Sequence, residues 1–157
     1  MLFASVYSYV VLVLTAATLF YVAFTDLQEF KIRNELVLVL AGLFLIYSLL
    51  SGRWVGIYWN IALAGVTFAA MLYYYQQGMM GGGDVKLLAV AFLWVGVWGA
   101  VPFVVLLTAS ILVHLGVAKL GWAQYKESAL GKRIPLGPSV AAALTGTLVS
   151  GYLMSYL

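Results

Sequence analysis

Two aspartates are the residues of this chain best placed to do chemistry. Asp26 and Asp84 stand 58 positions apart, and each adjoins the end of a long apolar run. Two carboxyl groups that lie close together do not both ionise easily, so one can act as a base while the other holds a proton. Such a pair can activate water for hydrolysis, which is the chemistry of aspartyl proteases.

Each aspartate also has a simpler interpretation. Asp84 follows three glycines, Gly81, Gly82 and Gly83, and it could serve only as the N-cap of the next helix. That role does not explain the glycines, whose missing side chains would let a substrate backbone approach closely. Asp26 follows an apolar run, where a helix C-terminus disfavours negative charge. Its alternative is a solvated loop residue.

Two basic or titratable residues have open roles. Lys86 comes two positions after Asp84, where it could tune the carboxyl pair, contact a substrate group, or simply set membrane topology or contact lipid phosphates. His114 lies deep in an apolar run, where an ionisable group is costly and invites a functional interpretation. A neutral histidine that hydrogen-bonds between helices is the interpretation we favour.

The composition places these residues in a membrane protein. Of 157 residues, 65% are hydrophobic and 8% are charged, against roughly 25% charged residues in ordinary soluble domains. We expect one membrane-embedded domain over residues 1–157. With no cysteine and a single histidine, the sequence offers no disulfide framework and no ready zinc centre, so we expect no metal and no cofactor.

The apolar runs predict an all-α, polytopic protein with six transmembrane helices. The longest uncharged run is divided because Gly96, Gly99 and Pro102 predict a turn and the start of a new helix. The second and fourth spans are short for a bilayer, so the glycines before Asp84 would wall a cavity open to the cytoplasm. The six predicted spans cover about residues 3–25, 35–50, 54–76, 84–98, 101–119 and 136–156.

Basic residues predict the orientation. The loops after the first, third and fifth spans carry seven of the eight Lys and Arg residues, and only Arg53 lies on the opposite face. Since basic loops stay on the cytoplasmic side, both termini are expected outside, and both aspartates toward the cytoplasm. The segment between Lys119 and Pro135 is expected to be a solvated, lipid-facing loop.

Three segments, in this order, resemble those of a known family. They are "DLQEFKIRNEL" from Asp26, "GGGDVKLL" with Asp84, and "RIPLGPSVA" before the last predicted helix. Their order and spacing are similar to those of the type IV prepilin leader peptidases, intramembrane aspartyl proteases of the GxGD architecture. Arg33 stands where that family usually has proline, and Leu136 where it often has tyrosine.

The resemblance implies a function and a site. It implies an aspartic endopeptidase of a prokaryotic inner membrane that removes a short basic leader, after a glycine, from a prepilin or pilin-like helix. Asp26 and Asp84 would be catalytic, while Gly81, Gly82, Gly83, Lys86, Glu29 and Asn34 would contact the substrate. The short chain resembles the minimal branch that serves tight-adherence pili, so we expect cleavage without N-methylation. The expected partners are the substrate helix and membrane lipids, with no nucleic acid.

Other functions fit some of the same residues. An archaeal preflagellin peptidase would use the same chemistry on another substrate. A small proton- or cation-coupled transporter subunit could use recessed carboxylates as a relay, although such proteins usually contain internal repeats, and we find no convincing repeat here. A non-catalytic scaffold for pilus assembly would have no need of both carboxylates. The sequence does not specify an oligomeric state.

Overall fold

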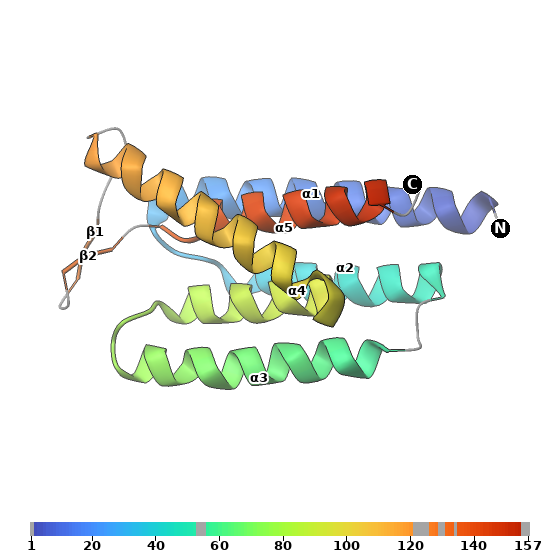
Figure 1. The fold of residues 1–157 in the computed structure, drawn as a ribbon, viewed down its shortest axis with the longest axis horizontal. Coiled ribbons are helices and arrows are strands. Elements are labelled where there is room, and N and C mark those ends of the chain that lie inside the picture. The colour runs from blue at the N-terminus through green and yellow to red at the C-terminus, as the bar shows by residue number, and fades with distance from the viewer. Residues whose placement is uncertain (1, 53–55, 121–125, 129–130, 134, 155–157) are drawn as a thin grey trace.

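The chain folds into a bundle of long helices with one short hairpin (Figure 1). The structure is a computed structural model, and it describes residues 2–52, 56–120, 126–128, 131–133 and 135–154. In chain order the elements are α1 (Leu2–Glu29), α2 (Asn34–Ser51), α3 (Ile57–Gln76), α4 (Gly82–Lys119), β1 (Lys126–Ser128), β2 (Gly131–Arg133) and α5 (Gly137–Met154).

The helices have the length and surface of membrane-spanning segments. Among the described residues, α1, α2, α3 and α4 are each long and apolar enough to cross a bilayer. Large apolar side chains cover the outside, and Trp98 is 97% exposed. Such a surface is stable when hydrocarbon is the solvent, and water would disfavour it. The prediction of a membrane protein depends on this same apolar character of the helices. The number of six spans stays a prediction.

Helix boundaries differ from the predicted ones at α1. The first span was expected to end near residue 25, but α1 continues to Glu29 and carries Asp26 in its last turns. The helix ends at Phe30, whose φ of 50° is left-handed. That conformation often ends helices, but glycine is the usual residue there because a side chain strains the backbone. A bulky residue at this point is therefore unusual.

The longest helix, α4, is broken at Gly96. Its φ of 61° and ψ of −172° are not helical, so the predicted interruption is present, but the chain is helical again before Pro102. A Cβ at position 96 would collide with the side chain of Asn60 from α3. The Asn60 Nδ2 donates a hydrogen bond of 3.2 Å to the Leu93 carbonyl oxygen. The break thus depends on glycine and on a polar partner that satisfies a carbonyl near it.

The all-α prediction misses one element. Between α4 and α5, in the segment expected to be a loop, β1 and β2 pair antiparallel with Lys126 opposite Arg133. Three residues per strand make a ribbon too short to pack a core of its own. The fold class is otherwise helical throughout the described ranges.

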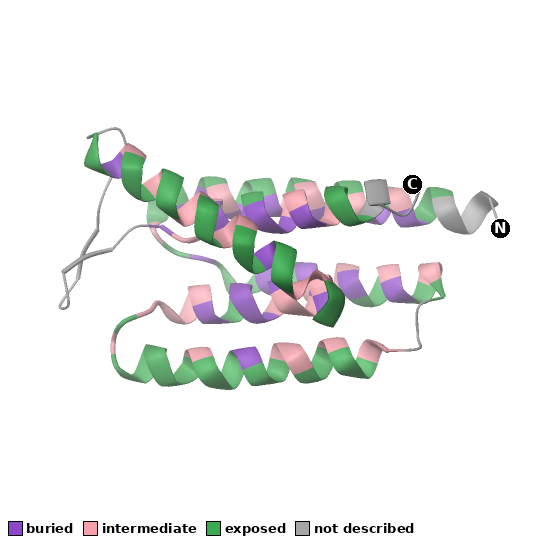
Figure 2. Ribbon diagram, in the orientation of Figure 1, coloured by how far each residue is buried: buried purple, intermediate pink, exposed green. Residues whose placement is uncertain are grey.

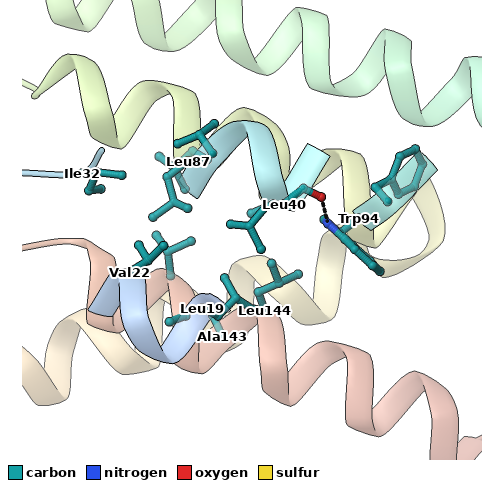
Figure 3. Packing of buried hydrophobic residues seen from close by; sticks show 14 of the residues in the cluster. Leu19, Val22, Ile32, Leu40, Leu87, Trp94, Ala143 and Leu144 are labelled. Carbon is teal, nitrogen blue, oxygen red and sulfur yellow. Dashed lines mark hydrogen bonds between the residues drawn. The ribbon is translucent and has the colours of Figure 1, made fainter. Parts of the chain in front are cut away.

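The buried faces of the helices meet in one apolar cluster. Leu19 and Val22 of α1 pack with Leu40 of α2, Leu87 of α4 and Leu144 of α5 (Figure 3). Figure 2 shows the buried residues on the sides of these helices that face one another. Burial of each such side chain contributes about 1.5–3 kcal/mol in water, and between lipid-facing helices close packing supplies the corresponding attraction.

Most connections lie at one end of the bundle. The α1–α2 loop, the α3–α4 loop and the hairpin before α5 share that end, while α2 ends and α3 begins toward the other (Figure 1). Grouping of the basic loops on one face is what the charge pattern predicts. We call the end with these three connections the loop end.

Candidate active site

Asp26 is a buried carboxylate with a partner far along the chain. Its side chain is buried, with 3% of the residue exposed. Its Oδ2 accepts a hydrogen bond of 2.7 Å from the backbone N–H of Gly137, 111 residues later. Gly137 is the first residue of α5, so the carboxylate lies at the positive end of that helix dipole. The C-terminal end of α1 disfavours a negative charge, whereas the N-terminal end of α5 stabilises one at Asp26.

Gly137 is a site residue that we did not predict from the sequence. A Cβ there would lie 2.8 Å from both the Cβ and the Oδ2 of Asp26. Ordinary side chains do not make contacts that short, so only glycine fits without movement of α1 or α5. The available signal was its place just before a proline at the start of an apolar run, which marks a helix start but does not identify its partner.

Asp84 also bonds to a backbone N–H, but within its own segment. Gly81 is the N-cap of α4 and Asp84 is the third helical residue, so the N-cap interpretation of Asp84 is wrong in detail. Its Oδ2 accepts a hydrogen bond of 3.2 Å from the Gly81 N–H, which is the return half of a capping box. The residue is half-buried, so this carboxylate is less enclosed than that of Asp26.

The glycines before Asp84 have close neighbours inside the protein. A Cβ on Gly81 would lie 2.8 Å from the Asp84 Oδ2, and one on Gly83 would lie 2.9 Å from the Ile32 Cβ. A Cβ on Gly82 would be 3.4 Å from the Tyr75 ring, which is an ordinary contact. Internal packing therefore accounts for two of the three glycines. Their contact with a substrate stays a prediction.

The segments that carry the two aspartates are linked at the loop end. Ile32, in the loop that follows α1, packs against Gly83 at the start of α4. Nearby, the Lys86 Nζ donates a hydrogen bond of 2.9 Å to the Asn34 Oδ1, which joins α4 to α2. Val22 precedes Asp26 by one turn and Leu87 follows Asp84 by about one turn, and both belong to the same buried cluster.

Both carboxylates therefore adjoin one core at one end of the bundle. A direct approach of the Asp26 and Asp84 carboxyls stays a prediction.

The remaining candidates have partners of their own. Glu29 forms an exposed i,i+4 ion pair of 3.2 Å with Arg33, which stabilises a surface helix end only slightly. The His114 Nδ1 lies 3.4 Å from the Ser139 Oγ, so the histidine joins α4 to the first turn of α5. Within the described ranges no three His, Asp or Glu residues gather as metal ligands.

A groove lies beside Asp26 between α1, α4 and α5. Its volume is about 650 Å³, and its lining includes Leu27 and Phe30 from the end of α1. Val113 lines it from α4, and Pro138 and Ala142 line it from α5. Leu27 and Pro138, which follow Asp26 and Gly137 in the chain, both line the groove, so it lies near the Asp26–Gly137 contact. We call this space the α1–α4–α5 groove.

Comparison with known proteins identifies the family. The sequence profile of the type IV leader peptidase family matches residues 13–117, which include Asp26 and Asp84. The chain belongs to the type IV leader peptidase family. The matched region ends before the hairpin and α5, so Gly137 lies outside it.

One relative of this chain has a name that describes an activity. A prepilin leader peptidase/N-methyltransferase from Aeromonas hydrophila is 33% identical over 128 residues. The alignment covers 76% of this chain and 42% of that relative. The chain therefore matches less than half of the length of that protein. No solved structure matches the fold significantly.

Proposed function

We propose that this type IV leader peptidase is an aspartic endopeptidase that cuts the short basic leader from prepilin-like proteins. The observation that carries the proposal is the Asp26 carboxylate, buried at the loop end and held by the first N–H of α5. Asp84 adjoins the same core at the same end. The Aeromonas relative, named for prepilin processing, supports a substrate of that class.

The proposed reaction uses one ionised and one protonated aspartate. The ionised carboxylate takes a proton from water, and the water oxygen attacks the carbonyl carbon of the scissile peptide bond. The protonated carboxyl donates its proton to the carbonyl oxygen, so the intermediate carries no full negative charge. As the C–N bond breaks, the leaving amine receives a proton from the carboxyl that accepted it from water. The carboxyl that protonated the carbonyl oxygen regains a proton from a hydroxyl of the diol intermediate as the new carboxyl group forms, so both aspartates return to their starting states.

The hydrogen bond from Gly137 favours Asp26 as the ionised partner. A backbone N–H at a helix start stabilises negative charge, and at 2.7 Å it is well placed to do so. Asp84 accepts a longer bond from Gly81, and it is left as the proton donor. Lys86, Asn34 and the glycines 81–83 lie around Asp84 at the loop end, where we place the cleavable part of the leader.

The proposal has a membrane setting. We place the loop end at the cytoplasmic face of a prokaryotic inner membrane, with both chain ends outside and lipids around α1 to α4. The basic residues of the three connections support this orientation. Residues 1–157 are taken as one membrane-embedded domain that works without a metal or cofactor.

Paired substitutions test the chemistry. Asp26→Asn and Asp84→Asn each keep side-chain size but remove the acid, so we expect cleavage of a coexpressed prepilin to fall by at least about 100-fold. Glu35→Gln, at an exposed position of α2, is the matched change outside the pair. Membrane fractions should hold all three variants in equal amounts. Undiminished cleavage by both aspartate variants would falsify the proposal.

Mass measurement of the product tests the finer claims. The purified protein is incubated with a prepilin, and the new N-terminus is identified from the product mass. The prediction is a cut after glycine with no added methyl group. A product heavier by one methyl group, in the presence of a methyl donor, would contradict cleavage without methylation and leave the peptidase reaction intact.

A further inference from the structure

We propose that the α1–α4–α5 groove binds the apolar helix of the substrate and delivers the scissile bond to Asp26. The inference rests on the proposed function and adds where the membrane part of the substrate lies. The groove is open toward the surroundings of the bundle, and among the described residues that line it none is an Asp, Glu, Lys or Arg. A surface of this kind suits an apolar occupant in a bilayer.

The direction of the groove matches the order of parts in the substrate. Its lining on α4 runs from Leu106 to Val117, or about 16 Å at 1.5 Å per residue. Val117 lies near the end of α4 at the loop end, where Leu27 and Phe30 also line the groove. A helix that enters from the bilayer would therefore make about three turns of contact before its chain reaches Asp26.

The walls of the groove suit close helix packing. Ala109 of α4 and Ala142 of α5 both line it and both are exposed. Small residues let the backbone of another helix approach closely, which is a main source of attraction between helices in lipid. His114 and Ser139, which lie 3.4 Å apart, line the groove together with Ser110, and the other described lining residues are apolar.

The strained residue at the end of α1 adds an independent observation. Phe30 has a left-handed backbone, a conformation in which glycine or asparagine is much less strained. Phe30 is also among the residues that line the groove. Residues held in such conformations cluster at binding sites, where the surrounding structure offsets the strain. At the point where a substrate helix must unwind, Phe30 would supply an apolar contact. This contact is a reason for phenylalanine at that position.

Continuity with Asp26 favours a substrate helix over other occupants. A lipid chain could fill the same space, but it has no need of a groove whose lining includes the chain neighbours of Asp26 and Gly137. The substrate alone must reach from the bilayer to the aspartate.

Cysteine cross-linking tests the position without relying on cleavage. The chain contains no cysteine, so Ala142→Cys gives a single thiol in the groove. In an Asp84→Asn background it is paired with prepilins that carry one cysteine at successive positions of the apolar helix. We expect cross-links that recur every three to four residues, as on one face of a helix. Ala69→Cys, an exposed alanine on α3, is the matched control.

Several outcomes would overturn the inference. Equal cross-linking from Ala142→Cys and Ala69→Cys would mean that the prepilin helix does not bind preferentially in the groove. The absence of any cross-link to the prepilin would have the same meaning. Disulfide-linked dimers of Ala142→Cys, in place of substrate cross-links, would assign the groove to a second copy of the chain.

A filled groove tests the effect on activity. Ala109→Leu with Ala142→Leu should raise KM for a prepilin with its helix by about tenfold, with little change in kcat, because helix binding stabilises the ground state and the transition state equally. Ala69→Leu should leave KM unchanged. Equal KM values for the two variants would contradict the inference. If the double variant does not fold, the cross-linking result decides.

The two proposals can fail separately. Cleavage by the parent protein without cross-linking at Ala142→Cys would retain the peptidase and remove the groove from its mechanism. Patterned cross-linking without cleavage would retain a helix-binding groove and remove the proposed peptidase reaction.

Discussion

Two glycines, at opposite ends of the bundle, each let a polar side chain from another helix reach the backbone. At the loop end, Gly137 brings its N–H to the Asp26 carboxylate. At the other end, the break at Gly96 lies against Asn60, whose amide donates to the Leu93 carbonyl. The geometry is similar, but the chemistry differs.

The difference indicates that the contact at Gly137 serves function and the contact at Gly96 serves structure. Asparagine is neutral, and at Gly96 it satisfies a carbonyl close to where the helix is interrupted. The residue that meets Gly137 is Asp26, an acidic side chain in a buried place. A buried charge is costly unless it has a use or a strong partner. Substitutions at the loop end should therefore lower activity first, and substitutions at the Gly96 break should lower stability first.

The largest expected effect is that of Gly137→Ala on activity. The new Cβ would lie 2.8 Å from the Asp26 Oδ2, so the carboxylate or α5 must move. We expect the rate of prepilin cleavage to fall by about 100-fold or more, on the scale of a displaced catalytic group. Gly65→Ala, where a Cβ meets nothing within 4 Å, is the control. A Gly137→Ala enzyme as active as Gly65→Ala would remove the contact from the mechanism.

Gly96→Ala should have the opposite profile. A positive φ and a collision with Asn60 both oppose a side chain there, so we expect a loss of stability of about 1–3 kcal/mol. The melting temperature in detergent should fall, while cleavage per folded molecule stays near that of the parent. Asn60→Ala should cost about 1 kcal/mol because its hydrogen bond to the Leu93 carbonyl is removed. An unchanged melting temperature for Gly96→Ala would show that the break tolerates a side chain.

Gly83→Ala should have an intermediate effect. Its Cβ would press on Ile32 at 2.9 Å, and the α1–α2 loop would have to shift. We expect about a tenfold loss of cleavage, because small displacements near a reacting group are costly.

The neighbouring change Gly82→Ala separates packing from substrate contact. Internal packing gives no reason for a loss there, since the nearest atom is 3.4 Å away. A loss of cleavage at unchanged stability would therefore support the predicted contact of the glycines with the substrate. If Gly82→Ala and Gly83→Ala behave alike in both measurements, Ile32 is not the reason for Gly83.

The smallest expected effect concerns Lys86 and Asn34. Their hydrogen bond of 2.9 Å is exposed, so Lys86→Gln and Asn34→Ala should each change cleavage by less than about threefold. The double variant should be no worse than the worse single variant if their only role is to hold each other. A shift of the pH profile in Lys86→Gln alone would instead show that the lysine acts on the aspartate pair.

Local sequence patterns predicted much of this fold. Apolar runs located the helices, and the cluster of Gly96, Gly99 and Pro102 correctly predicted an interruption, although only Gly96 is non-helical. Asp26 and Asp84 stood out because charge is rare in this chain, and the region that matches the family profile spans both positions.

The missed features depend on contacts between distant segments. No local rule connects Asp26 with Gly137 across 111 residues, since their meeting depends on how α1 and α5 pack. The hairpin after α4 has no alternating apolar pattern to mark it. The prediction from apolar residues alone also placed the end of the first span too early, because α1 continues through polar residues to Glu29.

Under the proposed function, and with α5 embedded in the bilayer, the hydrogen bond between α5 and Asp26 would couple cleavage to bilayer thickness. α5 has 18 residues, or about 27 Å, close to the hydrocarbon thickness of a membrane. A thicker or thinner bilayer should tilt or shift such a helix, and its first residue holds the carboxylate. If the proposed function holds, cleavage rates in vesicles should peak at one acyl-chain length.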